Sequence, residues 1–390
     1  MITKISNGRI ILGDKIEDGL CIYTEDDRVL AITAENLPFD EEYDAGGNYV
    51  SPGFIDIHCH GGGGGDFMDG TVDAFLTAAN LHAKHGTTTL IPTTLTASRE
   101  QILNAFAILD DVNAQNTHGS YMPGFHLEGP YFSLAQSGGQ NPEQIRPPQK
   151  DEYEDVLRYG DKVLRWSSAP ELPGTEEFAK ALSDNGTVAA IGHSDADYDC
   201  VVKAHELGYS LITHLYSCTS TVHRKNAYRY AGIVEAAYLI DDMDVEIIAD
   251  GKHLPAPLLK FVYKFKGPDK IALITDALRG AGFPDGTKIF TGNAEDGRYA
   301  IIEDGVAKLP SREAFAGSVT TTNKLVRNMI NMAGASLTDA IKMATATPAR
   351  IMKLSDRGTL RDGAFADIVV FDDNIDVKLT MVNGRIVHTT

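Results

Sequence analysis

Imidazole and carboxylate side chains recur in this sequence at the points where apolar, strand-like runs end. His58 and His60 close the run FIDIHCH, and Glu128 closes YMPGFHLEG. His193 follows TVAAIG, and His214 follows YSLIT. A Glu/His/His set is a ligand type of catalytic zinc sites that keep one coordination position open for water. The pattern therefore predicts a divalent-metal site formed by Glu128, His193 and His214.

The two histidines of His58-Cys59-His60 point to the same side of a strand, because side chains alternate along it. Taken alone, this HxH pattern is compatible with a metal role and equally with a buried structural position. The five glycines at 61–65 fit a loop that bends over a site. They do not fit a phosphate-binding loop, since neither a lysine nor a helix-opening pattern accompanies them.

A metal hydrolase also needs a group that moves protons, and Asp276 in LITDA ends another apolar run. A carboxylate beside a metal can take a proton from water and deliver it to a leaving group. His253 in ADGKH is a candidate for a hydrogen bond to substrate or for stabilising developing negative charge. We expect Asp250 to orient that loop, and His126, on the strand face of Glu128, to support the metal ligands from behind.

The remaining histidines show no comparable placement at the end of an apolar run. We expect the first four of them on helix or loop surfaces. They are His82, His85, His118, His205, His223 and His388.

Eight apolar runs alternate with amphipathic stretches such as VDAFLTAANLHAKHG in the middle of the chain. This alternation predicts parallel βα units, and eight of them predict an α/β fold of the (β/α)₈ TIM-barrel type. The carboxyl ends of barrel strands meet at one mouth, where active sites are built. A doubly wound open sheet is the alternative. The runs are FIDIHCH, TTTLIPTTL, YMPGFHLEG, KVLRWSSAPE, TVAAIGHSD, YSLITHLYS, VEIIAD and KIALITDA.

Both ends of the chain have a different character from this middle part. Short β-type runs such as ITKISNGRIIL and ADIVVFD are separated there by Gly, Asp and Asn, which favour turns. We expect one small β-sandwich domain built from residues 1–50 and 358–390. The catalytic barrel would then occupy residues 51–357.

The composition bounds the function further. The 390 residues include 54 acidic and 35 basic side chains, a formal net charge of −19, which disfavours a nucleic-acid partner. No apolar run approaches the ~20 residues of a membrane helix, and MITKISNGRIIL lacks the pattern of a secretory signal. The sequence thus predicts no membrane association. The dispersed cysteines predict reduced thiols and a cytoplasmic protein; they are Cys21, Cys59, Cys200 and Cys218.

A set of ordered motifs carries a family resemblance: PGFIDIHCHG, HLEGP, GHSDA, THLYS, ADGKH, LITDA and FAGS. Together they resemble the amidohydrolase superfamily, and most closely its N-acetylglucosamine-6-phosphate deacetylases. The resemblance covers essentially the whole chain. It implies metal-dependent hydrolysis of the acetamide of N-acetylglucosamine-6-phosphate, or of a related N-acetylhexosamine phosphate, in amino-sugar catabolism. It also implies a homodimer, with the insertion at 282–310 as one candidate contact.

The resemblance implies a ligand role for Glu128, His193 and His214 toward the main divalent metal. His58 and His60 match an HxH motif that supports a second metal in some members. One or two ions per chain are therefore expected, with zinc first and iron, manganese or cobalt as alternatives. No lysine suited to a bridging carbamate stands out in the fourth run, KVLRWSSAPE.

Asp276 matches the catalytic aspartate of the family, which deprotonates the attacking water and then protonates the departing amine. The segment from Asp250 to His253 matches a substrate-contacting DGxH motif. A loop over the sugar is implied for Phe315, Ala316 and Gly317.

Three substrate-handling positions depart from the family pattern. Ser217-Cys218-Thr219 stands where NAM usually follows the sixth-strand histidine, and Gln140 stands where the family carries a histidine. The family's phosphate-binding arginine has no clean counterpart. The basic residues near that position, which could bind the phosphate instead, are Arg224, Lys225 and Arg229.

These departures keep two other functions open. One is another amidohydrolase activity, D-aminoacylase-like or on a cyclic amide, with a non-sugar substrate. The other is a non-catalytic scaffold that has kept the barrel for assembly. The scaffold is disfavoured because it has no reason to retain both the predicted metal ligands and Asp276.

Overall fold

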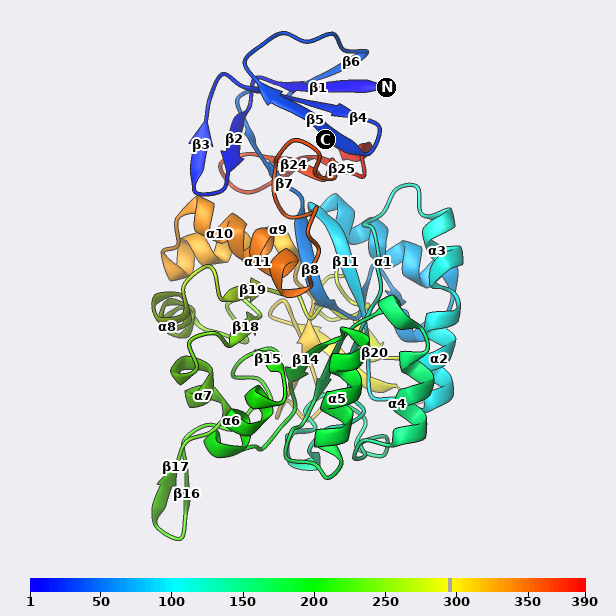
Figure 1. Ribbon diagram of the computed structural model, residues 1–390, viewed down its shortest axis with the longest axis vertical. Helices are drawn as coiled ribbons and strands as arrows, with labels where there is room; N and C mark the ends of the chain where they lie inside the picture. Colours follow the sequence, from blue (N-terminus) through cyan, green and yellow to red (C-terminus); the bar gives the residue numbers. More distant parts are fainter. Residues whose placement is uncertain (294–296) are drawn as a thin grey trace.

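A barrel of eight parallel strands forms the body of the protein, in a computed structural model that describes residues 1–293 and 297–390 (Figure 1). The sheet order is β19-β18-β15-β14-β13-β12-β11-β8. Each predicted run contains or overlaps one of these strands, so the barrel prediction is confirmed. The strands are β8 (Phe54–Cys59), β11 (Thr87–Thr94), β12 (Phe125–Glu128), β13 (Val163–Ser168), β14 (Val188–Ile191), β15 (Tyr209–Ile212), β18 (Asp244–Ile247) and β19 (Ile271–Leu273).

The barrel closes along a seam between its last strand, β19, and its first strand, β8. The backbone N–H of Asp276 donates to the carbonyl oxygen of His58 at 2.8 Å, and the N–H of His60 donates to Ala277 at 2.9 Å. A parallel bridge also pairs Cys59 with Ala277. The seam therefore runs through residues predicted to do chemistry, and it joins segments that lie far apart in the sequence.

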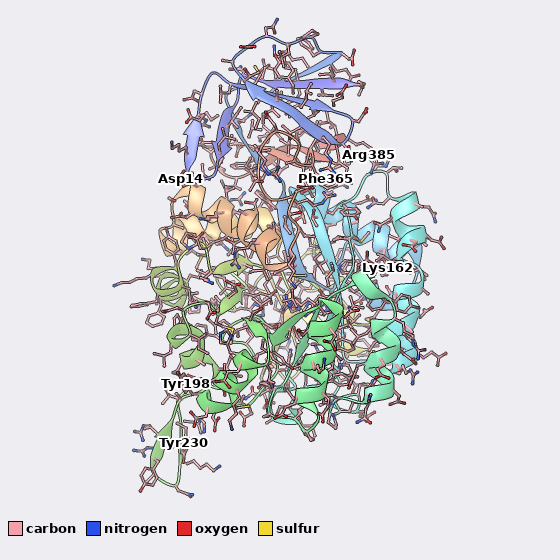
Figure 2. All side chains as sticks on the ribbon, in the orientation of Figure 1. Asp14, Lys162, Tyr198, Tyr230, Phe365 and Arg385 are labelled. Carbon is pink, nitrogen blue, oxygen red and sulfur yellow. The ribbon has the colours of Figure 1, made fainter. Side chains whose placement is uncertain are left out.

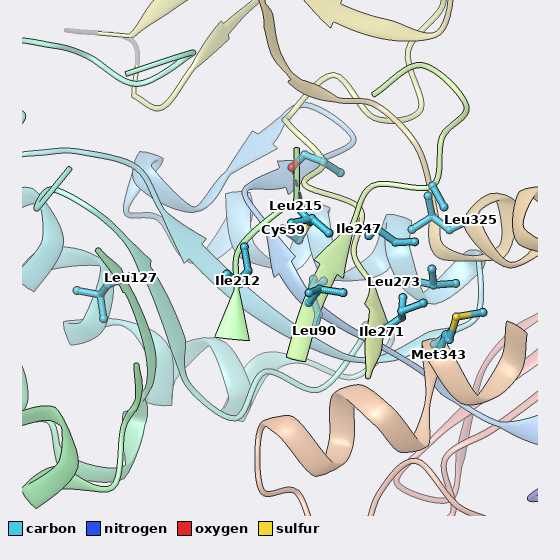
Figure 3. Close-up of a cluster of buried hydrophobic side chains, with 14 of the residues drawn as sticks. Cys59, Leu90, Leu127, Ile212, Leu215, Ile247, Ile271, Leu273, Leu325 and Met343 are labelled. Atoms are coloured by element: carbon cyan, nitrogen blue, oxygen red, sulfur yellow. Dashed lines mark hydrogen bonds between the residues drawn. The ribbon is translucent and has the colours of Figure 1, made fainter. Parts of the chain in front are cut away.

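Helices surround the barrel and supply the outer half of its core. In α1, the side chain of Thr71 caps the first turn and Phe75 is fully buried, a contribution of roughly 1.5–3 kcal/mol. Figure 3 shows strand residues such as Leu90 and Ile247 beside helix residues such as Met343. Among the described residues, no helix has the length and apolar character needed to cross a membrane.

The outer helices have the following bounds. The α-helices are α1 (Val72–Lys84), α2 (Arg99–Ala107), α3 (Leu109–Gln115), α4 (Lys150–Leu157), α5 (Thr175–Asn185), α6 (Tyr198–Glu206), α7 (Ile233–Leu239), α8 (Ala256–Lys266), α9 (Thr322–Asn328), α10 (Leu337–Ala344) and α11 (Ala346–Ile351). Short 3₁₀ turns are η1 (Phe67–Asp69), η2 (Leu134–Gln136) and η3 (Gly160–Lys162), and a π-helical turn is η4 (Met329–Ala333).

Two further sheets, built from both ends of the chain, lie together above the barrel in Figure 1. They share a core that includes Ile5, Ile22, Val50 and Leu379, as the sandwich prediction requires. We propose residues 1–50 and 358–390 as one domain on this packing. The strands are β1 (Ile2–Ser6), β2 (Arg9–Leu12), β3 (Lys15–Glu17), β4 (Cys21–Glu25), β5 (Arg28–Thr33), β6 (Glu41–Asp44), β7 (Tyr49–Pro52), β24 (Ile368–Phe371), β25 (Val377–Val382) and β26 (Arg385–Thr389).

Two insertions extend from the barrel. The first is a four-stranded sheet of β20 (Lys288–Thr291), β21 (Arg298–Glu303), β22 (Val306–Lys308) and β23 (Phe315–Ser318). Residues 294–296 of the predicted contact segment 282–310 lie outside the described residues. The second is a hairpin of β16 (His223–Lys225) and β17 (Tyr228–Tyr230), which projects from the end of the barrel away from the terminal sheets (Figures 1 and 2).

One surface prediction is wrong, because His82 is fully buried. It lies on the helix face begun by Phe75 and Ala79, so the helical period turns it inward. Its Nε2 atom donates to the carbonyl oxygen of Gly61 at 3.0 Å and lies 3.3 Å from the Cys59 sulfur. The other three histidines predicted at surfaces are exposed or half-buried: His85, His118 and His205.

Candidate active site

The end of β12 places the Glu128 carboxylate, only 2% exposed, among four imidazole rings. Its Oε1 atom lies 3.1 Å from His193 Nε2 and 2.9 Å from His214 Nε2. His58 Nε2 lies 3.5 Å from the same oxygen, and His60 Nε2 lies 3.3 Å from Oε2. The structure therefore brings together all five side chains predicted as metal ligands.

Asp276 faces this cluster from the barrel seam. Its Oδ1 atom lies 3.1 Å from His60 Nε2 and 3.6 Å from His58 Nε2. Unlike the ligand carboxylate, its side chain keeps 13% of its surface exposed and lines a pocket. Asp276 is therefore placed between the Glu128/histidine cluster and the space in which a substrate would lie.

The backbone adopts an uncommon conformation at three of these residues. His193, His214 and Asp276 have φ values of 47°, 31° and 48°, in the left-handed region. Each such residue costs of order 1–3 kcal/mol and persists only where neighbouring contacts enforce it. At Asp276, the seam hydrogen bond to His58 and one accepted from Ser318 N–H, at 2.9 Å, provide that enforcement. The conformation is therefore fixed before any ligand arrives.

Every imidazole of the cluster has an acceptor at Nδ1. The acceptors are Gln136 O for His193 (2.8 Å), Ser217 O for His214 (3.1 Å), Thr93 O for His60 (3.2 Å) and Glu246 Oε2 for His58 (3.3 Å). Carbonyl and carboxylate oxygens only accept, so each neutral ring carries its proton on Nδ1 and directs the Nε2 lone pair to the centre. This arrangement is typical of histidines that ligate metals.

The electrostatics of the cluster link the binding of a cation to the loss of protons, because an imidazole must be neutral to ligate a metal. Burial opposes charge on His58 and His60, but nearby Glu128 and Asp276 outweigh it and raise the pKa of His58 to about 9 and of His60 to about 10. Burial likewise opposes ionisation of the two carboxylates. The facing imidazoles outweigh it, keeping the pKa of Glu128 well below its usual range and lowering that of Asp276. Both carboxylates are therefore negative at neutral pH.

The donor set fits one or two divalent cations. Within each of two groups that share Glu128, one with His193 and His214 and one with His58 and His60, the ligand atoms lie within 4.8 Å of one another. In addition, His58 Nε2 is buried without a hydrogen-bond partner. A metal ion would satisfy such a buried nitrogen, which faces the carboxylates of Glu128 and Asp276.

A pocket of about 200 Å³ opens over this cluster. Most of the predicted substrate contacts line it: Gln140, Ser217, Cys218, His253, Phe315, Ala316 and Gly317. Asp250 lies behind His253 and accepts a 2.7 Å hydrogen bond from its Nδ1. It also accepts from the backbone N–H groups of Lys252 and His253, each at 2.8 Å, and so orders this loop.

The glycine run does not cover the mouth as expected. It forms a tight hairpin of β9 (Gly61–Gly62) and β10 (Gly65–Asp66) that packs against the segment after β19. A side chain at Gly65 would lie 2.3 Å from the carbonyl oxygen of Ala74, so only glycine fits there. The run therefore supports the barrel wall beside the site.

Gln140 is turned toward Glu128. Its Nε2 donates to Glu128 Oε2 at 2.5 Å, and its Oε1 accepts from the N–H and the hydroxyl of Thr96 at 2.8 and 2.9 Å. The residue is only 4% exposed. These contacts make Gln140 a clamp on the predicted ligand carboxylate, a role that the sequence did not indicate.

We expect Gln140→Ala to weaken metal binding about 10-fold to 100-fold, the usual cost of losing a residue that supports a ligand. Competition with a metal-binding dye would measure the change. Gln149→Ala provides the control, since Gln149 is exposed in the same connection. Equal affinities in the three proteins would show that the clamp has no role in binding.

The three basic residues predicted for the phosphate do not reach the pocket of their own chain. Arg224 pairs with Arg229 across the projecting hairpin, and Lys225 pairs with Tyr228. All of them are exposed. Among the described residues, the pocket lining includes neither lysine nor arginine. The prediction fails within one chain because the insertion pairs only with itself and leaves the barrel surface.

Below the cluster lies a layer of buried polar side chains. His126 accepts from or donates to Ser167 at 2.7 Å, and its ring centroid lies 4.6 Å from that of His58, as expected for a supporting residue. Arg165 and Glu246 form an ion pair there that the sequence reasoning missed. The sequence did carry a signal. A charge inside an apolar strand needs a buried partner, and Arg165 lies inside the fourth run while Glu246 lies inside the seventh.

Comparisons with known proteins agree with this geometry. The amidohydrolase family model matches residues 49–387. An N-acetylglucosamine-6-phosphate deacetylase of Lysinibacillus sphaericus is 31% identical over 350 residues, covering 89% of this chain and 87% of its own. The crystal structure of such a deacetylase from Pasteurella multocida superposes with a TM-score of 0.91 at 26% identity, covering 99% of both chains.

A further solved structure shows a bound substrate. It is an Asp-to-Ala mutant of the Mycobacterium smegmatis deacetylase in complex with N-acetyl-D-glucosamine-6-phosphate, 30% identical with a TM-score of 0.89. It covers 100% of this chain and 99% of its own. The chain described here therefore belongs to the amidohydrolase family and, within it, to the family of N-acetylglucosamine-6-phosphate deacetylases.

Proposed function

We propose that this protein hydrolyses the acetamide of N-acetylglucosamine-6-phosphate, releasing acetate and the amino sugar phosphate. The observation that carries the proposal is the position of Asp276, which lies against the His58/His60 pair and also lines the pocket. Its relatives of known name act on this class of substrate. The proposed role in the cell is amino-sugar catabolism.

A divalent cation held by Glu128, His193 and His214 would polarise the amide carbonyl and lower the pKa of a bound water. The chain itself supplies the proton transfers. Asp276, ionised at neutral pH, accepts a proton as the water oxygen bonds to the carbonyl carbon. The carboxyl group then gives this proton to the amide nitrogen as the C–N bond breaks, so one residue acts first as base and then as acid.

The pocket lining would orient the sugar. His253 donates from Nδ1 to Asp250, which leaves its Nε2 atom to contact a sugar hydroxyl. Phe315 packs edge-on against His253, with the ring centroids 4.8 Å apart. Ala316, Gly317, Ser217 and Cys218 complete the wall. His253 is therefore proposed as a substrate contact.

Zinc is the proposed metal, with one or two ions per chain. Imidazole and carboxylate ligands suit zinc, and they also accept iron, manganese or cobalt according to availability. The pairing of two ligand groups through Glu128 supports the two-ion arrangement. Metal analysis of the purified protein, together with reactivation of the metal-free protein by each ion, identifies the native species.

Acetate release from three compounds tests the proposed substrate. We expect hydrolysis of N-acetylglucosamine-6-phosphate, and slower hydrolysis of N-acetylgalactosamine-6-phosphate and of unphosphorylated N-acetylglucosamine. Failure on all three by the metal-loaded protein would refute the proposal. Such a result would favour the second candidate, an amidohydrolase with a non-sugar substrate. Two features support that candidate: the described pocket lining includes neither lysine nor arginine, and Ser217 and Cys218 depart from the family pattern.

A homodimer is proposed to complete the substrate site. A phosphate needs cations, whereas the described lining of the pocket includes neither lysine nor arginine and the hairpin exposes Arg224, Lys225 and Arg229. The hairpin also exposes Tyr228, which is 74% accessible. The neighbouring helices α7 and α8 expose Leu239, Phe261 and Phe265 at 65%, 44% and 57%. A second copy packed on this apolar face could direct its hairpin cations toward the phosphate.

The triple variant Arg224→Ala, Lys225→Ala, Arg229→Ala tests this arrangement. We expect its kcat/KM for the phosphorylated sugar to fall about 10-fold to 150-fold, since hydrogen bonds to charged groups contribute about 1.5–3 kcal/mol. Activity on the unphosphorylated sugar should stay unchanged. Light scattering of Leu239→Glu, beside a Leu30→Glu control at an exposed position on the terminal sheets, would report the oligomeric state. Equal losses on both sugars would contradict the phosphate role.

The cysteines support a cytoplasmic location. Cys21, Cys59, Cys200 and Cys218 are all free thiols in the structure. Reduced, dispersed cysteines are typical of a reducing compartment. Fractionation of the native cells would test the location directly.

A further inference from the structure

A fully buried ion pair lies directly beneath the cluster of Glu128 and its histidines. Arg165 on β13 donates from both terminal nitrogens to Glu246 on β18, from Nη2 at 2.8 Å, and both side chains are inaccessible to solvent. The guanidinium also donates to the Thr213 hydroxyl at 2.8 Å. Burying two charges is costly, and such pairs are often replaceable by apolar residues without loss of stability. A need other than stability therefore has to explain this pair.

The ion pair is connected to the cluster through His58. Glu246 Oε2 lies 3.3 Å from His58 Nδ1 and thereby accepts the ring proton. On the other side of the ring, Nε2 lies 3.5 Å from Glu128 and 3.6 Å from Asp276. The orientation and tautomer of this one imidazole are thus set from below by Glu246.

His58 differs in this respect from the other three imidazoles. Backbone carbonyl oxygens accept from Nδ1 of His60, His193 and His214, and no side-chain substitution removes those acceptors. A charged side chain performs the same task only at His58. A carboxylate partner also makes an imidazole a stronger ligand than a carbonyl partner does.

We propose that Glu246 is a positioning residue that sets the affinity of the His58/His60/Glu128 half of the site for a divalent cation. Arg165 keeps the Glu246 carboxylate ionised and aimed at His58. This inference rests on the proposed two-ion site. It is independent of the substrate, because it concerns metal affinity alone.

Glu246→Gln is the primary variant. Both carboxylate oxygens face donors, Oε1 facing Arg165 and Oε2 facing Arg165 and His58. An amide places an NH₂ group against one of these donors and cannot satisfy all of them. The variant therefore disturbs His58 while leaving the volume of the side chain unchanged.

Asp244→Asn is the matched control. Asp244 is the first residue of the same strand, two positions before Glu246, and pairs with Arg350 at 2.7 and 2.9 Å. The Asp244→Asn variant removes a carboxylate from an ion pair of β18 but leaves the Glu128/histidine cluster unchanged. Should Glu246→Gln fail to fold, the double variant Arg165→Met, Glu246→Leu removes both charges together, which avoids leaving one buried alone.

Calorimetric titration of metal-free protein with Zn²⁺, with a competing chelator, measures the two binding steps. In Glu246→Gln we expect the weaker step to lose about 10-fold to 100-fold in affinity while the tighter step changes little. Asp244→Asn should match the wild type in both steps. Proton NMR of the Co²⁺-loaded proteins adds a signature, since each coordinated imidazole gives a shifted N–H signal. The His58 signal alone should exchange faster with water in the variant.

Three results would overturn the proposal. The first is a wild-type protein that binds a single equivalent, and the second is an equal loss in both binding steps. The third is a His58 N–H signal that Glu246→Gln leaves unchanged. None of these results depends on acetate release. A failure of the proposed deacetylase activity is therefore distinguishable from a failure of this inference.

Discussion

Replacing Asp276 by Asn is expected to lower kcat by about 10²–10⁴-fold, the usual contribution of a positioned general acid–base group. The amide has nearly the same shape but can neither accept the proton of water nor deliver one to the amine. Metal content should match that of the wild type, because Glu128, His193 and His214 form their own ligand group. Acetate release under saturating substrate, with metal analysis of the same sample, provides the measurement.

The KM of this variant should change far less than its kcat, since other residues line most of the pocket. Asp285→Asn is a suitable control, because Asp285 is an exposed carboxylate in the segment after β19. Near wild-type turnover by Asp276→Asn would refute the catalytic assignment. Loss of metal together with activity would instead identify Asp276 as a ligand.

Replacing Glu128 by Ala is expected to abolish activity by removing metal. One carboxylate oxygen faces His58, His193 and His214, and the other faces His60. Both potential ion sites thus lose a shared ligand in a single change. The affinity for the metal ion should fall by more than the ~10–100-fold that follows the loss of a residue that only supports a ligand. Metal analysis after dialysis and an assay with excess Zn²⁺ would measure both effects.

A buried carboxylate outside the site separates this effect from a general loss of structure. Glu152 pairs with Arg146 and is 6% exposed. Glu152→Gln should therefore lower stability but retain metal and activity. Full metal content in Glu128→Ala would contradict the central role of this residue. Rescue of its activity by excess metal would show weakened binding instead of a destroyed site.

The strands and the ligand cluster were predictable because both depend on local signals. Apolar runs of β-type residues marked every barrel strand, and the polar residue ending a run marked the mouth. The convergence of Glu128, His193 and His214 was therefore predictable without knowledge of their contacts. Barrel topology then forces such strand ends together, since the carboxyl ends of parallel strands share one side.

Other features depend on tertiary contacts that no local pattern encodes. The turn of Gln140 toward Glu128 is set by Thr96, from a different loop. The basic hairpin carries the expected charges, but it projects from the barrel because its strands pair with each other. The sequence pattern does not encode this direction. To predict the ion pair of Arg165 with Glu246, one must know that their two strands face each other across the barrel interior. Sequence patterns report the surroundings of one residue, whereas these features are properties of pairs.

The seam of the barrel has a consequence for how the protein acquires activity. Every predicted metal ligand lies before residue 215, but Asp276 reaches the site only when β19 docks beside β8 through the His58 carbonyl. During synthesis the predicted ligands therefore emerge before the proposed proton carrier. An opened seam would withdraw Asp276 from the site, whereas the group of Glu128, His193 and His214 does not include a seam residue. In the proposed mechanism, bound metal alone would then not prove a competent enzyme, and turnover would report that the barrel has closed.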